Sequence, residues 1–193
     1  MMDNYVKEYY GKIKELIGSI DVTGKDLKKV SFYDGVYQAA ELIKKQTSLG
    51  KKLIFIGNGA SATISSHQAT DFWKNGGMRA IAFNDAALIT CLSNDIGYEY
   101  VFEKSIEMFA DDGDVLVAIS SSGQSKNIIK GALSAQKKNC DIITLSGFSV
   151  ENPLMSMGGI NFYVPSASYG HIEILHHSIC HCVLEYIIES VKK

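Results

Sequence analysis

The 193-residue sequence predicts an α/β protein in which helices cover both faces of a parallel sheet. From residue 51 onward, short apolar segments alternate with longer amphipathic segments, which is typical of this class. The apolar segments, of which residues 53–56 are the clearest, are nearly continuous, as expected for strands buried on both faces. Small polar residues follow two of these segments. Ligands bind at the carboxyl ends of such strands, so these turns predict a site.

The composition predicts a single folded domain over residues 1–193, with 46% hydrophobic residues, 21% charged residues and only 2 prolines. The formal net charge of −2 provides no general basic surface for nucleic acid. No apolar run approaches the ~20 residues that cross a bilayer. The first residues also lack the apolar centre of a signal peptide. We therefore expect a cytoplasmic protein without a nucleic acid or membrane partner.

The elements divide the chain into two parts. Residues 1–50 are predicted to form two helices, over residues 5–20 and 25–49, because apolar side chains recur on one face of each. These faces can pack on a partner subunit as easily as on the chain's own core. Residues 51–193 are predicted to form the α/β core and a closing helix over residues 170–191. The core strands are predicted at residues 53–56, 80–83, 115–119, 141–145 and 162–164, with helices at 60–73 and 126–138 and a broken helical region at 86–109.

A Gly-Asn-Gly turn at residues 57–59 follows the first predicted strand and leads into a helix that carries Ser61 in its first turn. Backbone N–H groups and the positive end of the helix dipole meet at such a turn, which suits an anion. A plain tight turn is the alternative. Further along the same helix, His67 and Asp71 are one turn apart and therefore neighbours. They are candidates for an acid/base pair or for metal ligands.

Residues 120–125, with the sequence SSSGQS, follow the third predicted strand and precede a helix. An N-cap needs one hydroxyl group, and this segment has four, so we interpret it as a second anion-binding turn. A capped polar loop is the alternative. The carboxyl ends of parallel strands meet at one edge of the sheet, so the two turns can converge on a single phosphate. Neither turn has the glycine and lysine spacing of the nucleotide-binding motifs.

Four of the five histidines fall between His171 and His181, in the last predicted helix. Glu173, His177 and His181 recur at i, i+4 and i+8 on one face, with His176 beside them. A solvated polar face is the alternative, but Lys and Glu form helices better than His does. Imidazole titrates near neutral pH and binds metals, which favours a functional role for this face.

The sequence resembles the sugar isomerase (SIS) domain family, and within it the bacterial phosphoheptose isomerases, over about residues 50–190. GNGAS at residues 57–61 resembles the family's GNGGS, and AISSSGQS at residues 118–125 resembles its GISTSGNS. LSNDIGYEYVF at residues 92–102 is similar to the family's GNDxG segment.

The helical motifs add to this resemblance. His67 and Asp71 fall where the family has a helical His followed four residues later by Glu. YVPS followed by HIEILHHSICH resembles the family's VP…RIQEIH…H. That alignment puts Glu173 at the family's Gln and His181 at its catalytic His.

The resemblance implies a three-layer sandwich with a five-stranded parallel sheet of the flavodoxin-like SIS type. It implies a homotetramer with active sites between subunits, and a phosphosugar as the substrate. The implied reaction converts sedoheptulose 7-phosphate to D-glycero-D-manno-heptose 7-phosphate, for lipopolysaccharide or capsule synthesis. The implied substrate-binding residues are Asn58, Gly59, Ser61, Asn94, Asp95, Ser120, Ser121, Ser122, Ser125 and Glu173. In the family a zinc ion, one per active site, can be bound by the equivalents of His67, Asp71, Glu173 and His181.

Aldose–ketose isomerisation removes a proton from a carbon next to a carbonyl group and returns it to the neighbouring carbon, through an enediol. We expect His181 and Asp71 to act as the acid/base pair. Three departures from the family pattern bear on the identity of the sugar: Asp71 replaces Glu, Glu173 replaces Gln, and His171 stands where the family has Arg. Glu173 and His181 are also eight residues apart, or ~12 Å along an ideal helix. Long side chains or a neighbouring subunit can bring such groups together.

Two other functions fit the same motifs. A non-catalytic SIS module would bind a phosphosugar or a protein partner, but relatives that act as adaptors lack the catalytic His, whereas His181 and the Asp71 carboxylate are present here. An isomerase that acts on a different phosphosugar is the second alternative.

Overall fold

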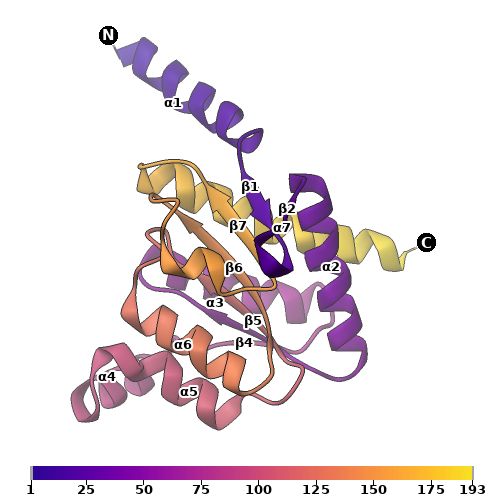
Figure 1. Cartoon of the computed structure of the whole chain (residues 1–193), viewed down its shortest axis with the longest axis vertical. Helices are drawn as coiled ribbons and strands as arrows, with labels where there is room; N and C mark the ends of the chain where they lie inside the picture. The colour runs from indigo at the N-terminus through magenta and orange to yellow at the C-terminus, as the bar shows by residue number, and fades with distance from the viewer. Residues whose placement is uncertain (1, 193) are drawn as a thin grey trace.

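A seven-stranded sheet runs through the centre of the computed structural model, which describes residues 2–192 (Figure 1). Five of its strands are parallel and have the order β7-β6-β5-β3-β4. This order is that of flavodoxin-like sheets. The predicted α/β class and five-stranded parallel sheet are therefore confirmed. The parallel strands are β3 (Leu53–Ile56), β4 (Ala80–Ala82), β5 (Val115–Ile119), β6 (Asp141–Gly147) and β7 (Ile160–Val164).

Two short antiparallel strands extend the sheet beyond β7, and the sequence did not predict them. β1 (Asp21–Thr23) pairs with β7, and β2 (Lys29–Val30) pairs with β1. The prediction of a helix from residue 25 was therefore wrong. The 3₁₀ turn η1 (Lys25–Leu27) contains two residues with positive φ, which an α-helix does not accommodate. α2 (Phe32–Ser48) begins only after Ser31, whose hydroxyl accepts the N–H of Asp34.

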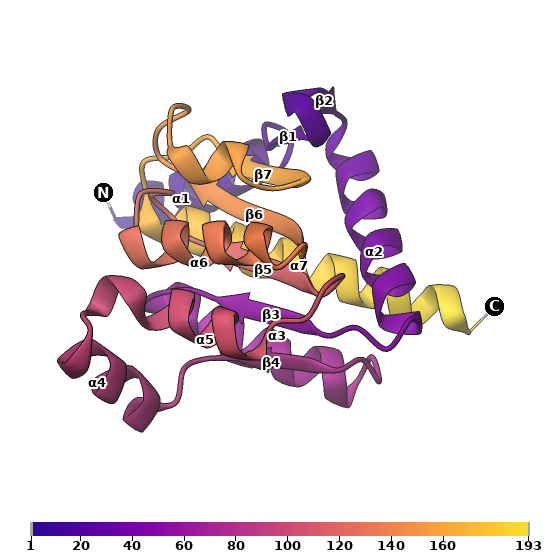
Figure 2. The ribbon, with the colours of Figure 1, turned by 60° about the horizontal axis from the view of Figure 1, so that its bottom comes forward.

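Helices cover both faces of the sheet, as Figure 2 shows. On one face lie α2, α3 (Ala60–Lys74) and α7 (Tyr169–Val191), and on the other α5 (Val101–Phe109) and α6 (Lys126–Lys137). The side chains of β3 alternate between the two cores: Phe55 packs into the first, and Ile54 and Ile56 into the second. Both faces are buried, which explains the continuous apolar run in the sequence.

The helical region predicted over residues 86–109 is broken into three pieces. α4 (Ala86–Asp95) lies at the periphery of the molecule and has no buried residue (Figure 2). The 3₁₀ turn η2 (Tyr98–Tyr100) connects it to α5, and a second such turn, η3 (Pro153–Ser156), precedes β7. The segment from α4 to η2 is thus attached to the core mainly through its C-terminal part.

The N-terminal helix α1 (Met2–Ile17) extends away from the rest of the molecule (Figure 1). Tyr5 and Tyr10 are exposed, while the ring of Tyr9 lies 4.5 Å from that of His171 on α7. The helix ends at Ile17, three residues before its predicted end. None of the helices within residues 2–192 is long and apolar enough to cross a membrane.

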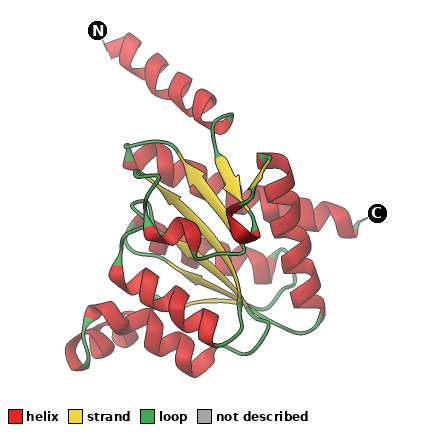
Figure 3. Cartoon of the chain, in the orientation of Figure 1, coloured by secondary structure: helices red, strands yellow, loops and turns green. Residues whose placement is uncertain are grey.

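The order of the strands creates a switch point between β3 and β5. The chain leaves β3 to form β4 on one side and then crosses back to form β5 on the other side. The arrowheads of the parallel strands point to the same end of the sheet (Figure 3). The loops after β3 and β5 therefore leave a crevice where ligands bind in such folds.

The opposite end of these two strands is held by a buried carboxylate. Asp114, only 1% exposed, accepts the backbone N–H groups of Lys52 and Asp111 and pairs with the Lys52 ammonium group. Replacing Asp114 by Ala leaves the two backbone N–H groups without this acceptor and removes one of the two carboxylates beside Lys52. We expect it to lower the free energy of unfolding by about 3 kcal/mol. Urea denaturation followed by circular dichroism measures this loss. Asp111→Ala is the matched control, because that carboxylate is 76% exposed and also pairs with Lys52. Equal losses in the two variants would contradict the role of Asp114.

Candidate active site

A pocket of about 280 Å³ opens at the carboxyl ends of β3 and β5. The turns after these strands and the first turns of α3 and α7 form its walls. The two turns that were predicted to converge on one anion therefore face the same cavity. Most of the predicted substrate-binding residues line it: Asn58, Gly59, Ser61, Ser120, Ser121, Ser122, Ser125 and Glu173. Tyr169 also lines the pocket, and no feature of the sequence had singled it out.

Three helices, α3, α6 and α7, begin at this pocket. Within the described residues, none of their N-cap side chains makes a capping hydrogen bond. Ser31 and Asp85, in contrast, do cap α2 and α4. Free N–H groups and the positive ends of three helix dipoles are therefore available to an anion. Ser125 occupies the N-cap of α6 without capping it, so a simple capped loop does not explain residues 120–125.

Both turns need glycine at one position. A Cβ atom on Gly57 would lie 2.4 Å from the carbonyl oxygen of Ser61, so a larger residue would force the turn away from α3. Gly123 has a φ of +64°, and a Cβ atom there would lie 1.9 Å from Oδ1 of Asn152. The glycines thus bring the backbone close to its neighbours and leave the hydroxyl groups to face the cavity.

The pocket presents neutral donors. The Ser120 hydroxyl accepts the N–H of Gly123 and donates to the Ser125 hydroxyl, which leaves the Ser125 hydrogen free for a ligand. In the described part of the chain, no Lys or Arg lines the cavity, and Glu173 is its one ionisable acid. An anion bound here is stabilised by hydroxyl groups, backbone N–H groups and helix dipoles.

Asn94 and Asp95 do not line this pocket within one chain. They lie at the exposed C-terminal end of α4, where the Asn94 amide donates to the Asp95 carboxylate over 2.8 Å. Their predicted contact with sugar hydroxyl groups stays a prediction.

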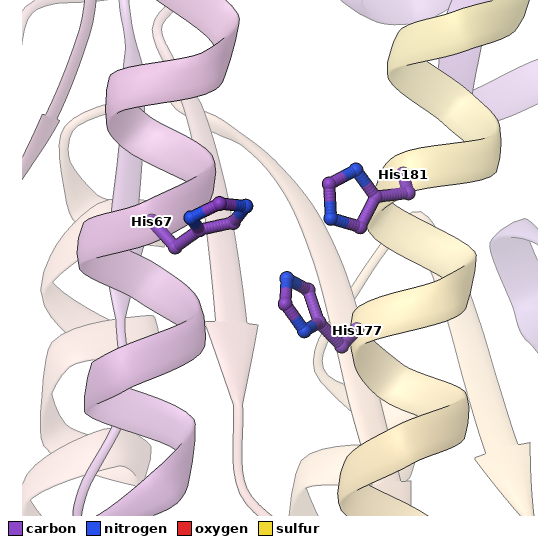
Figure 4. A group of neighbouring side chains, drawn as sticks. All are labelled: His67, His177 and His181. Atoms are coloured by element: carbon purple, nitrogen blue, oxygen red, sulfur yellow. The ribbon is translucent and has the colours of Figure 1, made fainter.

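Three histidine side chains face one another between α3 and α7 (Figure 4). His67 belongs to α3, and His177 and His181 belong to α7. One ring nitrogen of each lies within 4.8 Å of the others. The ring centroids are 4.6 Å apart for the pair on α7, and 5.0 and 5.3 Å from His67. Asp71 joins the cluster from the side, with Oδ2 lying 3.1 Å from Nε2 of His67.

The cluster suits a divalent transition metal. Burial lowers the pKa of His177, the rings of His181 and His67 lower it further, and Asp71 opposes them. Zn²⁺ binds neutral imidazole nitrogens at about 2.1 Å, which sets nitrogens in a tetrahedral site about 3.4 Å apart. The donor set therefore fits such an ion.

The geometry brings together only part of the predicted metal set. Glu173 lies at the pocket, one helical turn before His177, and His177 takes the place beside His67 and His181. The sequence places His177 and His181 one helical turn apart, but the family pattern predicted Glu173 as the ligand instead of His177.

His176 is not part of this cluster. It is fully buried, and its Nε2 donates to the carbonyl oxygen of Ser146 over 3.1 Å. Burial lowers its pKa to about 4, so it stays neutral. We conclude that this histidine has a structural role in joining α7 to β6.

The pocket and the histidine cluster are adjacent. His67 follows Ser61 by six residues on α3, and His177 follows Glu173 by four on α7. At 1.5 Å per residue these separations are about 9 and 6 Å along the helices. The pocket and the cluster are therefore separated along both helices by no more than the length of a small sugar phosphate.

Comparisons with known proteins agree with this geometry. The model of the SIS domain family matches residues 9–147. The phosphoheptose isomerase of Proteus mirabilis (strain HI4320) is 32% identical over 185 residues, which cover 93% of this chain and 96% of that protein. The phosphoheptose isomerase of Hamiltonella defensa is 37% identical over 163 residues, or 81% of this chain and 78% of that protein.

The solved structure of phosphoheptose isomerase from Neisseria gonorrhoeae superposes with a TM-score of 0.84 at 25% identity, and the match covers 97% of this chain and 99% of that one. The chain therefore belongs to the SIS domain family, as its motifs predicted, and its relatives place it with the aldose–ketose isomerases of that family.

Proposed function

We propose that the chain isomerises a phosphosugar, with sedoheptulose 7-phosphate and D-glycero-D-manno-heptose 7-phosphate as substrate and product. One observation carries the proposal: an anion pocket and a cluster of proton-carrying groups follow each other along the same two helices. The names of the relatives support the choice of sugar. A non-catalytic phosphosugar-binding module would need the pocket but not the cluster, so the cluster favours the enzyme.

The pocket would hold the phosphate group. Ser61, Ser122 and Ser125 offer hydroxyl groups, and the first turns of α3 and α6 offer N–H groups. Binding energy gained at this remote group would keep the carbonyl end of the sugar aligned between α3 and α7. Glu173 repels the phosphate and would face the neutral hydroxyl groups of the sugar instead.

His181 and Asp71 would carry the protons, on the parts of α7 and α3 that follow the pocket. Within residues 2–192 no hydrogen bond joins these two side chains. His67 lies between them: it bonds to Asp71, and its ring is 5.3 Å from that of His181. Asp71 thus orients His67 in the way that a carboxylate orients the base of a catalytic dyad. The His181 ring is half-buried, so part of it is accessible to solvent.

A zinc ion would be held by His67, His177 and His181, and when bound it would polarise the carbonyl group of the substrate. The ligand set predicted from the family, with Asp71 and Glu173, is the competing assignment. A homotetramer with shared active sites and a cytoplasmic location also belong to the proposal. The exposed tyrosines of α1 are consistent with a partner subunit.

Replacing His181 by Ala tests the proton carrier. We expect turnover of the phosphosugar to fall by ~10²–10⁴-fold, because a positioned acid/base group contributes that much. The dissociation constant of the phosphosugar should change little, since the pocket lies two turns away. NMR assays of product formation and isothermal titration measure the two quantities. Cys182→Ala, at the exposed neighbour of His181, is the control. Retained turnover in His181→Ala would remove His181 from the mechanism.

The metal ligands can be distinguished with cobalt, whose visible absorption reports coordination by nitrogen. We expect His177→Ala to lose Co²⁺ binding and Glu173→Gln to retain it. The reason is that a ring nitrogen of His177 lies within 4.8 Å of nitrogens of His67 and His181, whereas Glu173 is not in that group. Loss of binding in Glu173→Gln with retention in His177→Ala would favour the family ligand set instead.

Removal of metal distinguishes two roles of His181, as a proton carrier and as a metal ligand. A nitrogen that binds a metal ion has no lone pair for a proton, so one atom cannot serve both purposes. Proton transfer through His181 predicts that turnover persists after dialysis against a chelator. Loss of turnover that zinc restores would show instead that the ion takes part in the reaction.

A further inference from the structure

The side chain of Asn58 makes three hydrogen bonds within the protein. Its Nδ2 donates to Oδ1 of Asn127 over 2.8 Å. Its Oδ1 accepts from Nδ2 of Asn127 over 2.9 Å and from the Tyr98 hydroxyl over 2.8 Å. Asn58 belongs to the Gly-Asn-Gly turn of the pocket, and these partners take up its Oδ1 and one of the two hydrogens on Nδ2. The second Nδ2 hydrogen and the backbone remain for a ligand.

These bonds join three segments that are distant in the sequence. Asn58 follows β3, Asn127 lies in the first turn of α6, and Tyr98 begins η2. Asn127 is only 3% exposed, and its Oδ1 also accepts the N–H of Ile128. The amide pair therefore connects the turn at residues 57–59 with the helix that starts at Ser125.

The connection fixes the distance between the two anion-binding turns. Each turn alone could shift on its loop, but the paired amides hold the first turn against the helix that follows the second. Tyr98 closes the arrangement from the α4 side and ties the segment that carries Asn94 and Asp95 to the same turn. Groups held in place before binding lose less freedom when the ligand arrives.

We propose that Tyr98 and Asn127 are positioning residues for the pocket: by bonding to Asn58 they hold the two turns at the spacing that a phosphate group needs. The inference rests on the proposed binding of a phosphosugar. Neither side chain lines the cavity in the described chain, so both act through Asn58.

Tyr98→Phe tests this role, because it removes one hydroxyl group from a side chain that is 53% exposed and keeps the ring. The loss of one neutral hydrogen bond predicts that the dissociation constant for inorganic phosphate and the KM for the phosphosugar both rise about five-fold. The value of kcat should stay within about two-fold, since the histidine cluster is untouched. Tyr100→Phe, in the same turn, is the matched control. Its ring lies 4.2 Å from the Lys130 ammonium group, and we expect wild-type values.

Asn127→Ala provides a second variant, with its melting temperature measured alongside. It should raise the phosphate dissociation constant more than Tyr98→Phe does, because it removes both amide bonds. Wild-type phosphate binding and KM in Tyr98→Phe, or a fall in kcat at constant KM, would overturn the positioning role while the proposed function stands. A wild-type protein that binds neither phosphate nor any sugar phosphate would overturn both.

Discussion

The parallel sheet imposes the constraint on which the rest of the structure depends. Parallel strands end at the same edge, and the crossing between β3 and β5 leaves their two loops facing one crevice. The helices that follow these strands start at that crevice, and in the described part of the chain no N-cap side chain bonds to their first N–H groups. The small residues glycine, serine and asparagine in the two loops are then enough to form an anion pocket. The site is thus a consequence of topology before any reactive group is added.

The reactive groups come from the same helices that frame the pocket. α3 and α7 pack on the sheet through buried side chains such as Ile64, Phe72 and Ile179, and this packing fixes the direction of their polar faces. His67 and His181 therefore meet between the helices without any loop to position them. Asp71 is one methylene shorter than the Glu of the family pattern, and it bonds to His67 on its own helix. The shorter carboxylate therefore has a local partner in the His67 imidazole.

The sequence predicted the core well because the signal there is local and strong. The continuous apolar runs at β3 and β5 could only be buried strands, and their predicted bounds match the structure. The failure at residues 25–30 has a physical cause: β1 and β2 are two or three residues long and exist only because β7 offers an edge. No pattern in so short a segment reveals a pairing partner 140 residues away.

In the candidate site, too, features formed by consecutive residues could be predicted, and contacts between distant segments could not. Runs of serine and glycine after a strand identified the pocket, because the residues that line it are consecutive in the sequence. The pairing of His67 with His177 depends on how α3 packs beside α7, and the sequence gives the rotation of each helix but not their contact. The bonds among Asn58, Tyr98 and Asn127 are equally invisible, because three separate segments supply them.

The central claim is that the pocket and the histidine cluster act on one molecule, and proton exchange tests it most directly. The wild-type protein would be incubated in D₂O with sedoheptulose 7-phosphate and followed by NMR. The account predicts that deuterium enters the product at the carbon next to the carbonyl group. The substrate loses its C–H proton to a basic group of the cluster as the enediol forms, that proton exchanges with D₂O, and the enediol then takes up deuterium. A sugar phosphate that binds in the pocket without any exchange at that carbon would contradict it.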